Sequence, residues 1–276
     1  MAFASRPDAR ISFTVHEPAQ PVSDPETLLL IMGLTGSGRM WWRLVPSFSR
    51  RHRVIVFDNR GTGDSSPARR RLTMADMVGD TVAVLDSAEV DRAHVLGASM
   101  GGMIAQHLAL DHRDRIASLM LACTTAGGHP AAPNARLLTA ALLRPVLGPK
   151  RTFSLVAPAL YSPRTLDGAP DRVEEDLRRR ASDRVGGLTA WAQMSAIAGH
   201  NTRSRLSELA DLPTLVIHGT DDRIVPLEQG RDLAQRIPGA SFVEVRGAGH
   251  LLATDAEADV VSAVLTHVER HTAVTR

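Results

Sequence analysis

The chain lacks several features that would point to particular classes of protein. It has 276 residues and one cysteine, which excludes a disulfide within the chain. That cysteine, Cys123, follows an apolar run, so a buried small side chain is favoured over a reactive thiol. No apolar run has the length of a membrane span, and Met1 to Asp8 lacks the apolar core of a signal peptide. We therefore expect a cytoplasmic protein that does not associate with a membrane.

A strong charge of one sign is also missing. The 32 Lys and Arg residues and the 30 Asp and Glu residues leave a formal net charge of +2. No basic stripe with interleaved aromatic residues is present, which argues against nucleic-acid binding. The triplets Arg69–Arg71 and Arg178–Arg180 are interpreted as solvated surface. We expect a globular protein whose partner is a small molecule, and the sequence leaves a homodimer open.

Short apolar runs alternate with helix-like segments along most of the chain. Strands are expected at 10–17, 27–32, 53–57, 93–96, 116–122, 214–218 and 241–245, and helices at 41–49, 73–89, 100–110, 227–236 and 255–271. Several of the runs are apolar on both faces, as strands of a parallel sheet are. The alternation predicts an α/β fold with a parallel sheet and helices on both of its faces.

The alternation stops between residues 124 and 212. This segment is rich in Ala, Arg and Pro and has helix-like stretches at 134–143, 171–182 and 187–198, without a convincing buried strand. We expect a helical cap inserted into the core. The predicted division is a first core part at 1–123, the cap at 124–212 and a second core part at 213–276.

The most informative stretch is Gly97-Ala-Ser-Met-Gly101, between a predicted strand and a predicted helix. A Gly-x-Ser-x-Gly pattern in this context is typical of a nucleophile elbow. The tight turn forces its serine into a strained backbone conformation, and side chains two residues before or after it would collide. The following helix N-terminus favours a developing negative charge. The pattern indicates Ser99 as a nucleophile.

A serine nucleophile needs a neighbouring base, and that base needs an orienting acid. In a parallel sheet such residues gather at the carboxyl ends of the strands. Asp221 and Asp222 follow the predicted strand at 214–218, and His250 follows the strand at 241–245. The order Ser, Asp, His is therefore present, with two candidates for the acid.

These segments closely resemble the α/β-hydrolase family over essentially the whole core. The resemblance rests on Gly33, Asp58-x-Arg60-Gly61-x-Gly63-x-Ser65, the elbow, Gly219-x-x-Asp222-x-x-Val225-Pro226 and Gly247-x-Gly249-His250. It implies an α/β-hydrolase fold with a mostly parallel, doubly wound sheet of about eight strands. It also implies Ser99 as nucleophile and His250 as general base, and the spacing of the family selects Asp222 over Asp221 as the acid.

The same resemblance implies an oxyanion hole formed by the backbone N–H groups of Leu34 and Met100. Met32-Gly33 stands where the family usually has His-Gly, which looks more like polyketide methylesterase-type and enol-lactonase-like hydrolases. Such chemistry requires no cofactor and no metal. Met103 and Trp191 are further candidates for lining the substrate pocket.

The expected function is hydrolysis of a carboxylic ester or lactone through an acyl-enzyme on Ser99. A serine at the elbow argues against the epoxide hydrolases and haloalkane dehalogenases of this superfamily, which have an aspartate there. Cofactor-free haloperoxidase or perhydrolase activity, C–C bond hydrolysis and acyl transfer use the same triad and remain alternatives. A ligand receptor built on this fold is an alternative of a different class.

Overall fold

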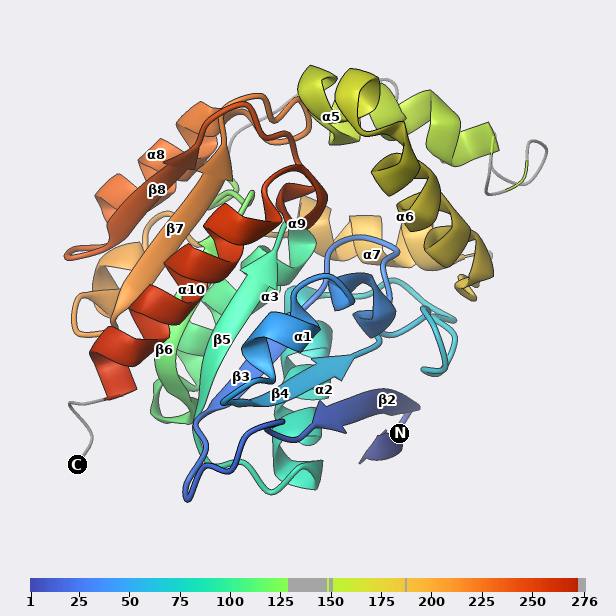
Figure 1. The fold of residues 1–276 in the computed structure, drawn as a ribbon. Helices are drawn as coiled ribbons and strands as arrows, with labels where there is room; N and C mark the ends of the chain where they lie inside the picture. Colours follow the sequence, from blue (N-terminus) through green and yellow to red (C-terminus); the bar gives the residue numbers. More distant parts are fainter. Residues whose placement is uncertain (129–147, 149–150, 187, 273–276) are drawn as a thin grey trace.

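The computed structural model describes residues 1–128, 148, 151–186 and 188–272, and its centre is an eight-stranded sheet (Figure 1). The strands are β1 (Ala2–Arg6), β2 (Ala9–His16), β3 (Thr27–Ile31), β4 (Arg53–Phe57), β5 (Ala93–Ala98), β6 (Ile116–Ala122), β7 (Thr214–Gly219) and β8 (Ser241–Val245). Their order is β1-β2-β4-β3-β5-β6-β7-β8, antiparallel from β1 to β4 and parallel from β4 to β8. The predicted α/β fold with a mostly parallel sheet is confirmed.

Both faces of the sheet are covered because successive side chains of a strand point in opposite directions. In β3, Leu28 and Leu30 pack with Phe48 on one face, whereas Leu29 and Ile31 belong to the core on the other. The first face is covered by α1 (Val45–Phe48) and α10 (Glu257–Thr272), and the second by α2 (Met74–Ser87), α3 (Met100–Asp111) and α8 (Leu227–Arg236) (Figure 1). A strand buried on both faces reads as a continuous apolar run.

The chain between β6 and β7 is helical over much of its described part. Residues 151–160 are helical, and α5 (Pro163–Gly168), α6 (Pro170–Ser182), α7 (Thr189–Ala198) and the 3₁₀ helix η3 (Leu206–Leu209) follow. Helices α5 and α6 lie beyond the carboxyl ends of β5 and β7 (Figure 1). The helices predicted at 171–182 and 187–198 correspond to α6 and α7, and the one predicted at 134–143 falls outside the described residues. The division into core and cap stays a prediction.

A buried ion pair joins α6 to the segment after β3. The Arg43 guanidinium lies 3.3 Å from Asp176 Oδ1. The hydroxyl groups of Tyr161 and Thr254 both donate to the other oxygen of Asp176. Because a buried charge is costly without partners, removing any one of these groups would leave the others poorly satisfied.

The structure differs from the expected elements at several places, and the helical residues 151–160 and α5 are among those not predicted. The strand β1 was not predicted, since Ala4 is its only buried residue and no apolar alternation marks it. The expected helix at 41–49 is instead a 3₁₀ helix, η1 (Gly38–Trp41), followed by the short α1, where Pro46 lacks the N–H that a continuous helix would use. The closing helix predicted at 255–271 corresponds to α10, and the short helix α9 (Leu252–Asp255) before it was not predicted. None of the helices in the described ranges is long and apolar enough to cross a membrane.

The turn between β5 and α3 packs directly against the end of β3. A Cβ atom added at Gly101 would overlap the carbonyl oxygen of Ile31, and one added at Gly97 would overlap the carbonyl oxygen of Gly101. Both obstacles are backbone atoms, one at the end of β3 and one in the first turn of α3. They cannot move aside as the end of a flexible side chain could.

We therefore expect Gly101→Ala to lower the free energy of unfolding by about 1–3 kcal/mol or more, because overpacking displaces backbone. Thermal or urea unfolding monitored by circular dichroism measures this change. Gly168→Ala is the matched control, since nothing lies within 4 Å of a Cβ added at this exposed glycine. Equal stability of the two variants would contradict the close packing of the turn.

Candidate active site

Ser99 stands at the start of α3 in a conformation that a non-glycine residue rarely adopts. Its φ is 55° and its ψ is −121°, as expected for the apex of a strained turn. The backbone is held on both sides: its N–H donates to Ala122 O at 2.9 Å, and Thr124 Oγ1 donates to its carbonyl oxygen at 2.7 Å. The hydroxyl itself makes no hydrogen bond within the described residues. The turn thus fixes the backbone and leaves the hydroxyl available.

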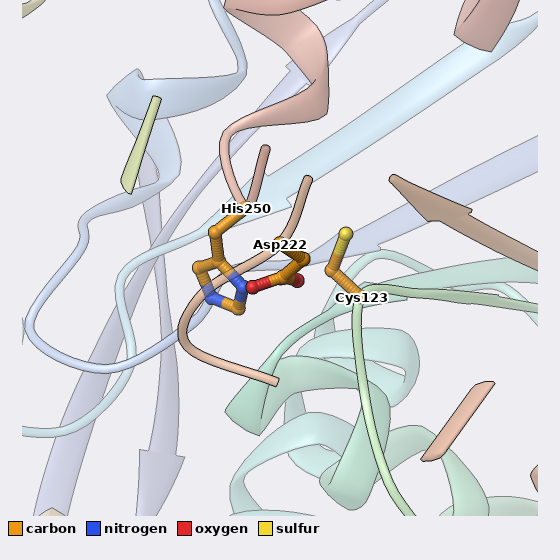
Figure 2. A group of neighbouring side chains, drawn as sticks. All are labelled: Cys123, Asp222 and His250. Atoms are coloured by element: carbon orange, nitrogen blue, oxygen red, sulfur yellow. The ribbon is translucent and has the colours of Figure 1, made fainter. Parts of the chain in front are cut away.

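Asp222 and His250 come together from the loops that follow β7 and β8. His250 Nδ1 lies 2.8 Å from Asp222 Oδ2, and Figure 2 shows the ring edge directed at the carboxylate. Asp222 Oδ1 accepts the backbone N–H groups of Ile224 and Val225 at 2.8 and 2.9 Å. With both oxygens bonded, the carboxylate has one orientation. It can hold the imidazole with its Nδ1 proton toward the acid, so that Nε2 is the basic nitrogen.

The environment of Asp222 keeps this carboxylate ionised. Burial raises its pKa, but the charge of His250 and the hydrogen bonds from His218, His250 and the Val225 N–H lower it more. The net result is a pKa well below the usual range of an aspartate. His218 is fully buried, with Nε2 at 2.9 Å from Val225 O and 3.4 Å from Asp222 Oδ2. It holds the Asp222 carboxylate in place, which is a structural role and not that of a second base.

Asp221 is placed differently from its neighbour. Its N–H donates to Ala248 O at 2.9 Å, and its Oδ1 accepts the hydroxyl of Thr220 at 3.0 Å. Its side chain makes no hydrogen bond to His250 in the described part of the chain. The geometry therefore favours Asp222 as the partner of the histidine.

Cys123 adds a thiol to this group. The ligand-type atoms of Cys123, Asp222 and His250 lie within 4.8 Å of one another (Figure 2). Burial and the nearby charge of Asp222 raise the pKa of the thiol well above its ordinary value, which keeps it protonated. Metals bind thiolates, and a metal here would also have to replace the bond between Asp222 and His250. The three side chains therefore fit a hydrogen-bonded Asp222–His250 pair beside a buried, protonated thiol better than they fit a metal site.

Two backbone N–H groups, of the residues that follow Ser99 and Gly33, suit a developing oxyanion. Met100 N–H is the first of α3, and Leu34 N–H belongs to the loop after β3. Neither donates to an acceptor within the described residues. Gly33 lets this loop approach Ser99, since a Cβ there would lie 3.1 Å from Ser99 Cβ and 3.6 Å from its Oγ. Preorganised donors of this kind stabilise a tetrahedral intermediate.

A narrow cavity of about 70 Å³ opens beside His250, under α6. Its walls are mostly apolar and include Met32, Met40, Trp41, Trp42, Leu96, Ala98, Ala122 and Leu252. Arg43 and Arg180 also reach the wall, but only Arg43 has a carboxylate partner, Asp176, among the residues that the structure describes. The cavity is thus mostly apolar, and on its α6 side the Arg180 guanidinium has no carboxylate partner in the described part of the chain and lies 5.5 Å from the centre of the Phe153 ring.

Neither of the two side chains proposed from the sequence as pocket residues lies in this cavity. Met103 is 6% exposed and packs in the core formed with α2 and α3. Trp191 is 50% exposed, with the Arg71 guanidinium 5.5 Å from its ring centre. Both lie on helices. From the sequence alone, a core or surface position on a helix cannot be told apart from one that lines a pocket.

Three neighbours of the site were not predicted to lie there, although the expected burial of Cys123 is confirmed. His218 and Cys123 both contact the acid, and each stands at the end of a predicted strand, which could have indicated them. Gln193 is different. Its Oε1 accepts the N–H of Thr35 at 2.8 Å although 158 residues separate the two, so no local pattern marks it.

The comparisons with known proteins agree with this architecture. A sequence profile of the α/β-hydrolase fold matches residues 26–256. The chain is 32% identical over 243 residues to the RutD protein of Variovorax paradoxus, whose assigned name is carbamate hydrolase, with 87% of this chain and 89% of that protein covered. A thermophilic esterase from Thermogutta terrifontis is 27% identical, with a TM-score of 0.83 and 97% of both chains covered.

An enol-lactonase from Burkholderia xenovorans superposes with a TM-score of 0.85 over 97% of this chain and 100% of that one. At 24% identity this likeness concerns the fold alone. The profile match covers most of the chain, including the elbow and the loops of Asp222 and His250. The chain therefore belongs to the α/β-hydrolase fold family.

Proposed function

We propose that the protein is a serine hydrolase that cleaves a carboxylic ester or a lactone. The observation that carries this proposal is the hydrogen bond between His250 Nδ1 and the buried Asp222 carboxylate. It lies at the carboxyl ends of the strands, where Ser99 directly precedes α3. An acid, a base and a hydroxyl in this order form the unit that activates a serine. The likeness to a thermophilic esterase supports an ester as the substrate class.

In the proposed reaction, His250 Nε2 takes the proton of Ser99 Oγ as that oxygen bonds to the carbonyl carbon. The backbone N–H groups of Leu34 and Met100 hold the oxyanion. The oxyanion collapses to an acyl-enzyme, and His250 returns the proton to the leaving alcohol oxygen. A water molecule then gives a proton to His250 and attacks the acyl carbon, which releases the acid and restores Ser99.

Hydrolysis of a carbamate is a second candidate, favoured by the 32% identity to the RutD protein. Ser99 Oγ, activated by the same groups, would attack the carbonyl carbon of a carbamate. Its nitrogen lone pair makes that carbon less electrophilic than the carbon of an ester. A panel of matched p-nitrophenyl esters, lactones and carbamates distinguishes the two candidates by kcat/KM.

We expect Ser99→Ala to lower kcat by about a thousandfold or more, because the nucleophile is removed. A fluorophosphonate probe should label the wild-type protein and not this variant, as read by mass spectrometry. Ser204→Ala, at an exposed position, is the control and should label normally. Undiminished turnover or labelling of Ser99→Ala would place the reaction elsewhere.

The two neighbouring aspartates give a sharper test of the acid. We expect Asp222→Asn to lower kcat by about ten-thousandfold, since the amide would hold His250 in the wrong tautomer. Asp221→Asn should stay within about threefold of wild type, because among the described residues Asp221 bonds only to Thr220 and to the backbone of Ala248. Steady-state kinetics on a p-nitrophenyl ester measures both. The reverse order would make Asp221 the acid.

The cavity predicts selectivity for the acyl group. A volume of about 70 Å³ admits a short chain, and the charge of Arg180 favours a carboxylate at its end. We expect mono-p-nitrophenyl succinate to exceed p-nitrophenyl butyrate in kcat/KM by about tenfold, the effect of one charge-assisted hydrogen bond.

Arg180→Gln should remove this preference and leave turnover of the uncharged ester unchanged. Arg178→Gln is the matched control, two residues away on the exposed side of the same helix. The same loss in both variants would point to the net charge of α6 instead of the cavity.

A further inference from the structure

The loop that carries the Leu34 N–H is fixed by hydrogen bonds on both sides of one peptide group. Asn59 Nδ2 donates to the carbonyl oxygen of Met32 at 2.8 Å, which holds the peptide before Gly33. Thr35 N–H donates to Gln193 Oε1 at 2.8 Å, which holds the peptide after Leu34. Since peptide groups are planar, the group between them has little freedom to rotate.

That middle peptide joins Gly33 to Leu34 and presents the proposed oxyanion donor. Its carbonyl oxygen accepts the N–H of Gly36 at 3.2 Å, closing a tight turn. Its N–H is left without an acceptor in the described part of the molecule. The Leu34 N–H is therefore available to meet a substrate oxygen.

The backbone at Thr35 needs such a restraint. Its φ is +57°, a left-handed conformation in which the backbone of a non-glycine residue is strained. Without its partner, the Thr35 peptide could relax toward an ordinary conformation and rotate the Leu34 N–H away from Ser99.

Gln193 comes from α7, in the segment between β6 and β7, and not from the core strands. Its side chain is fully buried, and its Nε2 donates to Arg60 O at 3.1 Å. One amide group therefore connects the loop after β3 with the loop after β4. Both of its polar atoms have partners, and the side chain has no freedom to turn.

We propose that Gln193 is a positioning residue for the oxyanion hole. Through this side chain, the packing of α7 on the core determines the direction of the Leu34 N–H. This inference rests on the proposed function and adds a residue to the same site. The alternative is that Gln193 merely attaches α7 to the core. Thr189 makes such an attachment on the same helix, where its hydroxyl donates to Gly61 O at 2.8 Å without contacting the loop of Leu34.

The test compares Gln193→Met with Thr189→Val. Gln193→Met removes two buried side-chain hydrogen bonds of α7 and Thr189→Val removes one, with side-chain volume nearly preserved in both, so both should lose some thermal stability. With a p-nitrophenyl ester, Gln193→Met should lower kcat by about 10- to 100-fold with little change in KM, as expected for a misdirected donor. Thr189→Val should change neither constant beyond about twofold.

A trifluoromethyl ketone gives a second readout that a purely structural role would not move. Ser99 Oγ adds to its carbonyl carbon, the proton passes to His250, and the resulting hemiketal oxyanion occupies the proposed hole. Gln193→Met should weaken its binding by the same factor as kcat/KM, as for a transition-state analogue. Should Gln193→Met not fold, Gln193→Asn serves instead, since its amide is one methylene too short to reach both partners.

Wild-type kcat and inhibitor affinity in the Gln193 variants, or equal losses in Thr189→Val, would overturn the inference. If Ser99→Ala is inactive at the same time, the proposed function stands and only the role of Gln193 fails. If Ser99→Ala keeps full turnover, the proposed function itself fails. The two results are therefore distinguishable.

Discussion

The site depends first on the close packing of the turn at Ser99 against the end of β3. Gly101 touches the carbonyl of Ile31 with no room for a Cβ atom, and Gly33 approaches Ser99 from the same side. This backbone contact places the proposed nucleophile and the N–H of Leu34 relative to each other within the middle of the sheet. Rigid strands are better supports for such a geometry than loops.

The loops that complete the site are then fixed by charge and hydrogen bonding. Asp222 is buried, and its ionised form persists because His218, His250 and backbone N–H groups supply enough partners to offset the cost of burial. The Asp176 carboxylate shows the same principle where α6 meets the core, with Arg43 as its counter-ion. Both carboxylates are held in one orientation, one next to the proposed chemistry and one at the wall of the cavity.

Most of the sheet could be predicted because a strand buried on both faces has a distinct pattern. Arg53–Phe57 and Ile116–Ala122 were predicted to the residue, as was the more exposed edge strand Ser241–Val245. The edge strand β1 could not be, since only Ala4 is buried in it. Asp222 and His250 could be chosen because parallel strands bring their carboxyl ends to one edge, and the structure joins the two side chains there. Their catalytic roles, like that of Ser99, are proposals.

By itself, the sequence determined the alternation of strands and helices, the tight turn at Ser99 and the two loops that carry an acid and a histidine. These are local patterns, each readable within about ten residues. Only the tertiary structure decided which side chains line the cavity and what holds the loop of Leu34. Gln193 and Thr35 are distant in the chain and share no pattern, because their contact arises from how α7 packs on the core.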